Sequence, residues 1–290
     1  MASGISFNKF SKFAVGIAAL TVVSMTLATS ASAAQPKVNL GTTASYAVLA
    51  GAGITNTGAT TVSGTAGGDM GSSPTGSFTG AADVTVTNGT KYEAVDPKTD
   101  GAKDDLVTAY NDAAGRTPVN SVGVELGGQT LTEGVYNSGS ELGITGTLTL
   151  DGQNNPDAVF IFQAGSTLIT ASSSSVNLIN GAQPCNVYWQ VGSSATFGTA
   201  SSFVGHVFAL TSITATTGAT FRGQLLARNG AVTLDTNTIV NDACAGAVPP
   251  TDEGGELPNT DAVDWIIPVS VGAGLLAIGA TVLVLRRKRR

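Results

Sequence analysis

A short internal repeat restricts the possible folds of this chain more than any other feature of its sequence. Shifting the sequence by 18 positions places SFVGHVFA (202–209) on TFRGQLLA (220–227), and a shift of 27 places FIFQAGST on VYWQVGSS. A unit of this length cannot bury its own apolar side chains, but stacked units can bury them against one another. The repeat therefore predicts a mainly β fold, a β-solenoid whose coils each contribute two or three short strands.

Alternating polar and apolar residues assign the two sides of the predicted strands. In the segment ITAT, Thr214 and Thr216 are expected to point outward, and in ATFR the same holds for Thr220. The segments VFAL and LLA, which follow one another at the repeat distance, are apolar on both sides. Strands of this kind are covered on both faces, so another element is expected to lie along this flank.

The segment TDGAKDDLVTAYNDAAGR has the pattern of an amphipathic helix, because its apolar residues recur at positions i, i+4 and i+7. We expect a helix over about residues 99–114, with Gly115 placed to cap its end. The helix is predicted to lie along the solenoid and to cover Phe208 and Leu226.

The first 33 residues have the pattern of a secretory signal. A lysine-containing start precedes the apolar run FAVGIAALTVVSMTLA and a small-residue cleavage site ending at Ala33. The mature domain is therefore expected to begin at Ala34 and to extend to Cys244, outside the cell.

The carboxyl-terminal end has the pattern of a surface anchor. After a predicted linker over residues 245–256, the motif LPNTD resembles a sortase sorting signal of Gram-positive bacteria, although Asp261 stands where Gly is usual. A charge-free segment over 265–285 is long enough to span a membrane, and the basic residues 286–290 are expected to stay in the cytoplasm. The motif consists of Leu257, Pro258, Asn259, Thr260 and Asp261.

These signals predict an exported protein at the cell surface, anchored to the cell wall or to the membrane. The expected partners at this end are a sortase, peptidoglycan and the membrane itself. If Asp261 prevents cleavage, the 265–285 segment serves as a plain membrane anchor.

Composition excludes several classes of function. Residues 34–244 contain 15 acidic and 7 basic residues, a balance of about −8, so there is no basic stripe for nucleic acid. The acidic residues Glu125, Glu133, Glu141, Asp151, Asp157 and Asp235 are scattered rather than paired as a glycosidase requires. We predict no enzyme activity, no cofactor and no metal site; DGQNNPD (151–157) is interpreted as a turn rather than a calcium loop, and His206 as a structural residue.

Two cysteines, Cys185 and Cys244, occur in this exported chain. A disulfide between them is the default interpretation, and two separate thiols are the alternative.

Several long segments resemble the microbial ice-binding protein family. They include YAVLAGAGITNTGATTVSG, LVTAYNDAAGRTP and CNVYWQVGSSATFGTASSFVGHVFALTSITATTGATFRGQLLARNGAVTLDTNTI, and the resemblance extends over about residues 39–244. It implies a right-handed, discontinuous β-solenoid of triangular section with one long helix packed alongside, a monomer, and one flat flank that binds ice.

The family's binding flank often carries the pattern Thr-Ala/Gly-any-Thr/Asn. Residues 217–220 and 57–60 fit this pattern, and 199–202 fits it loosely. Together with the outward positions, this gives the candidate ice-binding residues Thr57, Thr60, Thr199, Ser202, Thr214, Thr216, Thr217, Thr220 and Thr236. Leu148 and Ile239 stand where an exposed hydroxyl is expected, unless the alignment is out of register there.

The expected function is that of a cell-surface, antifreeze-like protein that adsorbs to ice and inhibits its growth or recrystallisation near the cell. Rows of threonine suit this role because the β-branch restricts χ1 and fixes a hydroxyl and a methyl in place. Threonine is also a good strand former in any sheet. The alternative is therefore a surface adhesion module or a structural cell-wall module without ice binding.

Overall fold

The computed structural model describes residues 34–245. The predicted signal, the sorting-like motif, the 265–285 segment and the basic tail lie outside the described residues, and those predictions stay predictions. Within the described part of the chain, no helix is both long and apolar enough to cross a membrane.

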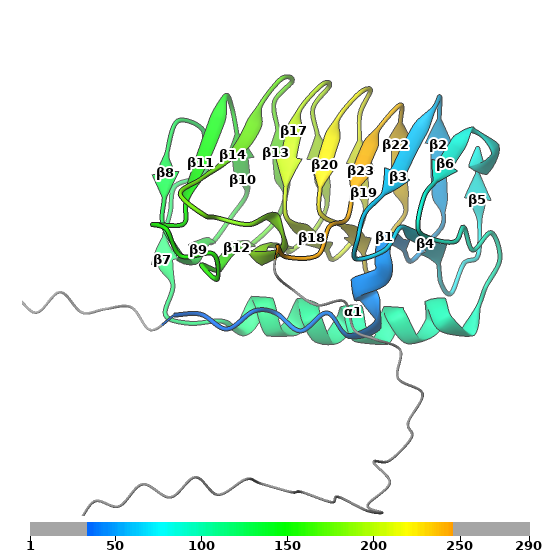
Figure 1. The fold of residues 1–290 in the computed structure, drawn as a ribbon, viewed down its shortest axis with the longest axis horizontal. Coiled ribbons are helices and arrows are strands. Elements are labelled where there is room, and N and C mark those ends of the chain that lie inside the picture. Colours follow the sequence, from blue (N-terminus) through cyan, green and yellow to red (C-terminus); the bar gives the residue numbers. More distant parts are fainter. Residues whose placement is uncertain (1–33, 246–290) are drawn as a thin grey trace, which may run out of the picture. The chain divides into compact units, whose positions relative to one another are not determined.

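Three parallel β-sheets, here named A, B and C, form a solenoid around one apolar core (Figure 1). Each coil supplies one strand to each sheet in turn, as β15, β16 and β17 do. In spatial order, sheet A consists of β4 (Asp69–Ser72), β1 (Tyr46–Ala50), β21 (Leu225–Ala227), β18 (His206–Ala209), β15 (Val187–Val191), β12 (Phe160–Ala164), β9 (Gly134–Ser138) and β7 (Asn120–Ser121).

Sheets B and C run side by side with sheet A. Sheet B consists of β10 (Leu142–Ile144), β13 (Leu168–Thr170), β16 (Ala195–Phe197), β19 (Ile213–Ala215), β22 (Val232–Asp235), β2 (Ile54–Thr57) and β5 (Phe78–Thr79). Sheet C consists of β6 (Val84–Val86), β3 (Thr60–Ser63), β23 (Thr238–Val240), β20 (Thr220–Arg222), β17 (Ser202–Val204), β14 (Ser175–Ile179), β11 (Thr147–Asp151) and β8 (Thr130–Leu131). Short 3₁₀ turns lie at Gly41–Ser45, Ala81–Asp83 and Pro184–Asn186.

The helix α1 (Pro97–Gly115) runs along the solenoid and covers sheet A (Figure 1). Its buried residues Leu106 and Tyr110 belong to one apolar cluster with Phe208 and Leu226 of sheet A. Apart from its exposed edge strand β7, sheet A is therefore largely buried on both faces. Strands of sheets B and C, such as β19 and β20, instead alternate between buried residues and residues that are at least partly exposed. The predicted cover of Phe208 and Leu226 by the helix is confirmed.

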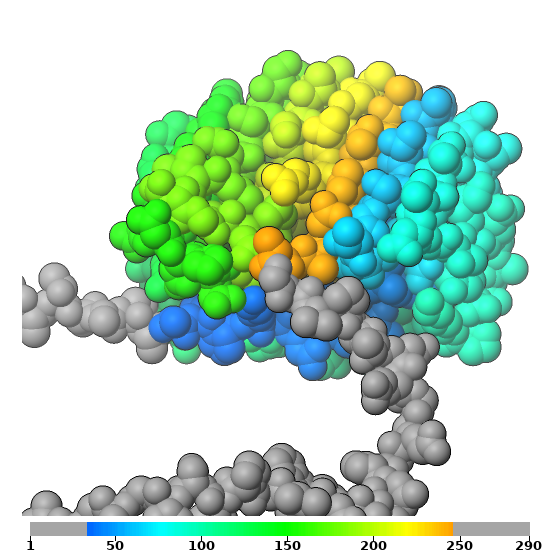
Figure 2. All heavy atoms as spheres, in the orientation of Figure 1, coloured from blue at the N-terminus to red at the C-terminus, as the bar shows by residue number. Residues whose placement is uncertain are grey.

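The order of the coils in space differs from their order in the sequence. The first coil, β1–β3, lies between the last coil, β21–β23, and the β4–β6 coil at one end of the solenoid. In Figure 2 this arrangement places the orange segment between the yellow strands and the blue ones. This discontinuity agrees with the resemblance stated above.

The turn between sheets C and A requires glycine. Gly223 has φ +147°, and a Cβ at this position would collide with the carbonyl oxygen of Gly205 in the neighbouring coil. Its N–H donates to the carbonyl of Val240 at 2.8 Å, so the backbones of successive coils approach closely at this corner.

Three details differ from the sequence-based expectations. The helix begins earlier, at Pro97, where the Asp96 side chain caps it by accepting from the Lys98 N–H at 2.9 Å. Gly115 is the last helical residue and does not have the left-handed conformation of a glycine cap. Leu148 and Ile239 are buried because Thr147 and Thr238, one position earlier, face solvent, so the expected alignment was out of register.

Candidate functional site

The outer face of sheet B carries an uninterrupted row of threonines. Register pairing places one threonine at the same position on five adjacent strands, β16, β19, β22, β2 and β5. The residues on either side of the threonines in β2, β16, β19 and β22 are buried; Ile213 and Ala215, which flank Thr214, are 0% and 1% exposed. We call this set the sheet B threonine row: Thr196, Thr214, Thr233, Thr55 and Thr79.

The hydroxyls of this row are available to solvent. Within residues 34–245, none of these five hydroxyls makes a hydrogen bond to the protein. Other surface threonines, such as Thr217 and Thr147, do make side-chain hydrogen bonds. The strands of sheet B contain a single charged residue, Asp235 at the end of β22. The face is thus a nearly uncharged array of rigid side chains on strands spaced by about 4.7–4.9 Å.

The row ends where the face becomes apolar. Beyond Thr196, the same position is occupied by Ile169 and Gly143. Ile169 is 49% exposed, and Val124 beside it is 48% exposed. They line a hollow of about 300 Å³ together with Glu125, whose carboxylate accepts from the Thr145 backbone N–H at 2.8 Å.

Sheet C carries a second row of hydroxyls, which runs over seven adjacent strands. Part of this row is bonded to itself, since Thr147 and Ser175 are joined at 2.9 Å and Thr61 donates to Thr238 at 3.3 Å. Arg222, on the same face, is exposed. The sheet C hydroxyl row consists of Thr147, Ser175, Ser202, Thr220, Thr238, Thr61 and Thr85.

A corner of stacked turns joins the two faces. The backbone N–H of Thr236 donates to the Thr57 carbonyl at 2.9 Å, and Gly218 and Ala200 continue the ladder by donating to the carbonyls of Asp235 and Thr217 at 3.0 Å each. The left-handed turn positions include Ala200, Gly218, Thr236 and Gly58. The corner row therefore reads Thr57, Asp235, Thr217 and Thr199.

Eight of the nine candidate residues are at least partly exposed, and they fall into three groups. Thr214 belongs to the sheet B threonine row. Ser202 and Thr220 belong to the sheet C hydroxyl row. The corner holds Thr57, Thr199, Thr216, Thr217 and Thr236.

Thr60 is the exception, and its expected exposure is wrong. Its side chain is fully buried and its hydroxyl accepts from the Asn237 backbone N–H at 3.0 Å. The motif at 57–60 is one residue out of step with 217–220, because Thr61 and not Thr60 pairs with Thr238, the partner of Thr220. Thr61 thus takes the outward position in β3.

Sequence reasoning missed most of the sheet B threonine row, namely Thr55, Thr79, Thr196 and Thr233. A signal for them was present, since each directly follows an apolar residue in the segments GITN, SFTG, SATF and AVTL, and Thr196 and Thr233 also precede one. Only the register of the strands, however, shows that the four threonines fall on one line.

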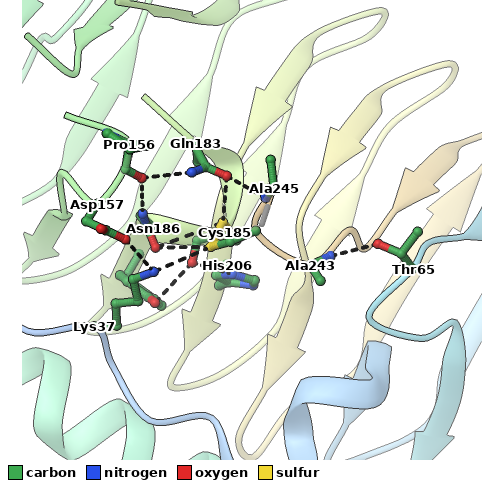
Figure 3. The surroundings of a disulfide bond; sticks show 12 residues. Lys37, Thr65, Pro156, Asp157, Gln183, Cys185, Asn186, His206, Ala243 and Ala245 are labelled. Atoms are coloured by element: carbon green, nitrogen blue, oxygen red, sulfur yellow. Dashed lines mark hydrogen bonds and ion pairs between the residues drawn. A yellow bond between two sulfur atoms is a disulfide. The ribbon is translucent and has the colours of Figure 1, made fainter. Parts of the chain in front are cut away.

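The expected disulfide is confirmed. Cys185 and Cys244 are bonded at a sequence separation of 59, and they join the end of the domain to the turn before β15 (Figure 3). Beside them, His206 is 3% exposed and its Nε2 lies 3.3 Å from the Cys185 carbonyl. Burial lowers the pKa of His206 to about 4, against the opposing effects of the Cys185 carbonyl and the Gln224 side chain.

The acidic residues of the described part of the chain are not grouped as metal ligands. Within residues 34–245, no three His, Cys, Asp or Glu side chains gather as metal ligands would. In the 151–157 loop, the Asp151 carboxylate accepts from the Gln153 N–H at 2.8 Å, which is the bond of a local turn. It also accepts from the Asn180 side-chain amide of the neighbouring coil at 2.9 Å.

Comparison with known families identifies the family of this solenoid. The profile of the family described as ice-binding-like matches residues 48–240. The chain belongs to the ice-binding-like family.

Members of the ice-binding-like family resemble the chain along most of its described length. An ice-binding protein of Nostoc sp. (strain HG1) is 48% identical over 207 residues, 71% of this chain and 74% of that protein. The crystal structure of an ice-binding protein from an Antarctic biological consortium is 45% identical, with a TM-score of 0.69 over 72% of this chain and 93% of that one. The structure of an ice-binding protein from Antarctomyces psychrotrophicus is 40% identical, with a TM-score of 0.66 over 71% and 98%.

Proposed function

We propose that this chain binds ice through the outer face of sheet B, and that the binding surface continues over the corner toward sheet C. The observation that carries the proposal is the sheet B threonine row, five aligned side chains with hydroxyls that make no bond to the protein. Membership of the ice-binding-like family supports ice as the ligand of this face.

The physical properties of the row suit a repeating lattice of water. Threonine loses little side-chain entropy on binding because its χ1 is already restricted. The methyl orders neighbouring water and the hydroxyl anchors it. Charged side chains would hold hydration shells that compete with this order, and the strands of sheet B carry only one, Asp235.

Sheet B is favoured over sheet C on two grounds. The hydroxyls of Thr147 with Ser175, and of Thr61 with Thr238, partly satisfy each other on sheet C. Arg222 also projects from that face and would keep its own hydration shell. Thr220 also donates its hydroxyl to the Ser201 carbonyl at 3.3 Å, so only Ser202 and Thr85 of the sheet C hydroxyl row keep hydroxyls without a bond to the described part of the protein. The five hydroxyls of the sheet B threonine row make no such bond.

We place this activity at the cell surface, where it would inhibit ice growth or recrystallisation. The support comes from the secretory pattern of residues 1–33, the LPNTD motif and the charge-free segment 265–285, with a sortase, peptidoglycan and the membrane as the partners of the anchor. The role is one of binding rather than catalysis, in keeping with the family and with the scattered carboxylates.

Growth of a polycrystalline ice hemisphere from a dilute solution of fluorescently labelled residues 34–245 tests the proposal. Direct ice binding gives uniform incorporation of the label into the ice, while a labelled protein without ice affinity is excluded under the same conditions. Exclusion of a sample shown to be folded by circular dichroism would overturn ice binding and favour the adhesion or structural cell-wall module instead.

A further inference from the structure

Asp235 occupies a place in the corner row where its neighbours present hydroxyls. It pairs in register with Thr57 on one side, and the ladder of backbone bonds places Thr217 on the other. It is also the one charged residue of the sheet B strands. A carboxylate at this place requires an explanation, because a mobile hydration shell opposes the ordering of water that ice binding needs.

The carboxylate is occupied by hydroxyl donors of the corner. Thr217 donates its hydroxyl proton to Oδ2 of Asp235, and Thr236 donates to Oδ1 at 3.0 Å. Hydrogen bonds from hydroxyls to a carboxylate are stronger than those between neutral groups. Asp235 therefore fixes the orientation of both hydroxyls, and these two hydrogen bonds replace part of the hydration of its carboxylate.

Two further corner hydroxyls, those of Thr216 and Thr199, are oriented in the same sense. Thr216 donates to the Phe197 carbonyl at 2.7 Å, which uses its only proton. The contact of 3.4 Å between the hydroxyls of Thr199 and Thr216 must then have Thr199 as the donor. Each of these hydroxyls directs its proton into the protein and presents only lone pairs to solvent.

This arrangement differs from that of the sheet B threonine row, whose hydroxyls can both donate and accept. We propose that Asp235 is a positioning residue of the ice-binding surface, which orients the Thr217 and Thr236 hydroxyls so that these two positions of the corner offer only hydrogen-bond acceptors to the adjoining water. Water molecules beside Thr217 and Thr236 then point a hydrogen toward the protein, in one defined orientation. The inference rests on the proposed ice-binding function.

The substitution Asp235→Asn separates orientation from charge. An amide of the same shape accepts one of the two hydroxyl protons but donates at its other end, so one hydroxyl must turn its proton toward solvent. If charge alone mattered, removing it would strengthen ice binding. If orientation matters, Asp235→Asn lowers the thermal hysteresis of residues 34–245 about threefold or more, since a mismatched hydrogen bond costs affinity.

The design includes a charge control and a structural readout. Asp104→Asn removes an exposed carboxylate on α1, remote from sheet B, and is expected to leave the thermal hysteresis unchanged. In NMR spectra, the Thr217 hydroxyl proton is expected to exchange slowly in the unsubstituted domain and rapidly in Asp235→Asn. Thermal midpoints of all variants show whether an effect comes from lost stability. The domain is tested alone because its core and its disulfide close within residues 34–245.

Coupling between positions provides the last test. If Asp235 acts through Thr217, then adding Thr217→Val to Asp235→Asn lowers the hysteresis by less than Thr217→Val does on its own. Additive effects, or an Asp235→Asn domain that binds ice as well as or better than the unsubstituted one, would overturn the role of Asp235 and leave the proposed function intact. Exclusion of the unsubstituted domain from ice would instead overturn the function and this inference together.

Discussion

Thr214 and Thr233 lie opposite each other on the neighbouring parallel strands β19 and β22, and both side chains reach solvent from the middle of sheet B. Three further threonines extend this pair to both sides. The two residues therefore mark the centre of the proposed binding surface, where a bulky substituent should interfere most with contact to a flat lattice.

The first prediction concerns this centre. Thr214→Tyr or Thr233→Tyr is expected to lower thermal hysteresis about tenfold or more, because the ring lifts the face away from the ice. The free energy of unfolding should change by only about 0.5 kcal/mol, as both side chains lie on the surface. The matched control is Thr238→Tyr, on sheet C. Loss of activity in the control, with activity kept in the sheet B variants, would show that sheet C is the binding face.

The second prediction concerns acid stability. The pKa of His206 is lowered by burial to about 4, whereas in an unfolded chain it is near 6.5. Below pH 6.5 the unfolded chain takes up a proton that the folded one refuses, so stability is lost as the pH falls from about 6.5 toward 4. The loss over this window is expected to be about 3 kcal/mol.

Urea unfolding at a series of pH values measures this loss. Because His206 is the single histidine of the sequence, His206→Gln should remove most of the pH dependence in this window. The lowered pKa values of Asp105 and Glu125 leave a smaller loss at its acid end. An equal loss of stability in the variant would assign the effect to carboxylates. An NMR titration of the imidazole with a midpoint near 6.5 in the folded protein would contradict the burial argument directly.

The disulfide leads to the third prediction. Replacing both Cys185 and Cys244 by Ser frees a loop of 59 residues in the unfolded chain, and chain entropy values this loop at about 4 kcal/mol. The thermal midpoint of the double variant should fall accordingly, as measured by calorimetry. In the cold, where the variant is still folded, ice affinity should persist, since neither cysteine lies on sheet B. A loss of affinity without unfolding would show that the disulfide shapes the binding face.

The fourth prediction tests the helical cover of sheet A. Leu106 is completely buried between α1 and sheet A, and Leu106→Ala is expected to cost about 2–5 kcal/mol. Thr108→Ala, on the exposed side of the same helix, is the control and should cost little. Equilibrium denaturation of both variants gives the comparison. Equal effects would mean that the helix contributes through its backbone and not through its apolar face.

The fold could be predicted from the sequence because its two strongest signals are local. The 18-residue repeat reflects the length of one coil, and two-sided apolar segments such as VFAL mark the sheet that the helix covers. Both signals can be recognised in the sequence without knowing which coils are neighbours in space. The helix could also be predicted from a local signal, the spacing of its apolar residues. Its exact start could not, because it depends on the cap that the Asp96 side chain provides.

The binding surface was harder to predict because it depends on register. A slip of one residue exchanges the inner and outer faces of a strand. That is what separates Thr60 from Thr61, and Leu148 from Thr147. The motif TGAT occurs twice with the same letters, yet its last threonine is exposed at 220 and buried at 60. Only the pairing with neighbouring coils distinguishes the two cases.

The discontinuous order of the coils has a consequence for how the surface comes into being. Thr55 and Thr79 precede the helix in the sequence, while their neighbours in the row come from β22 and the coils before it, near the end of the domain. During synthesis, the first two coils can pair with each other, but the other edge of the β1–β3 coil has no partner until β21–β23 have emerged. The row is therefore completed in one late step, when the last coil closes against the first. A chain that stops short of β22 would carry two separate fragments of the surface, and ice affinity should thus report on the completeness of the domain.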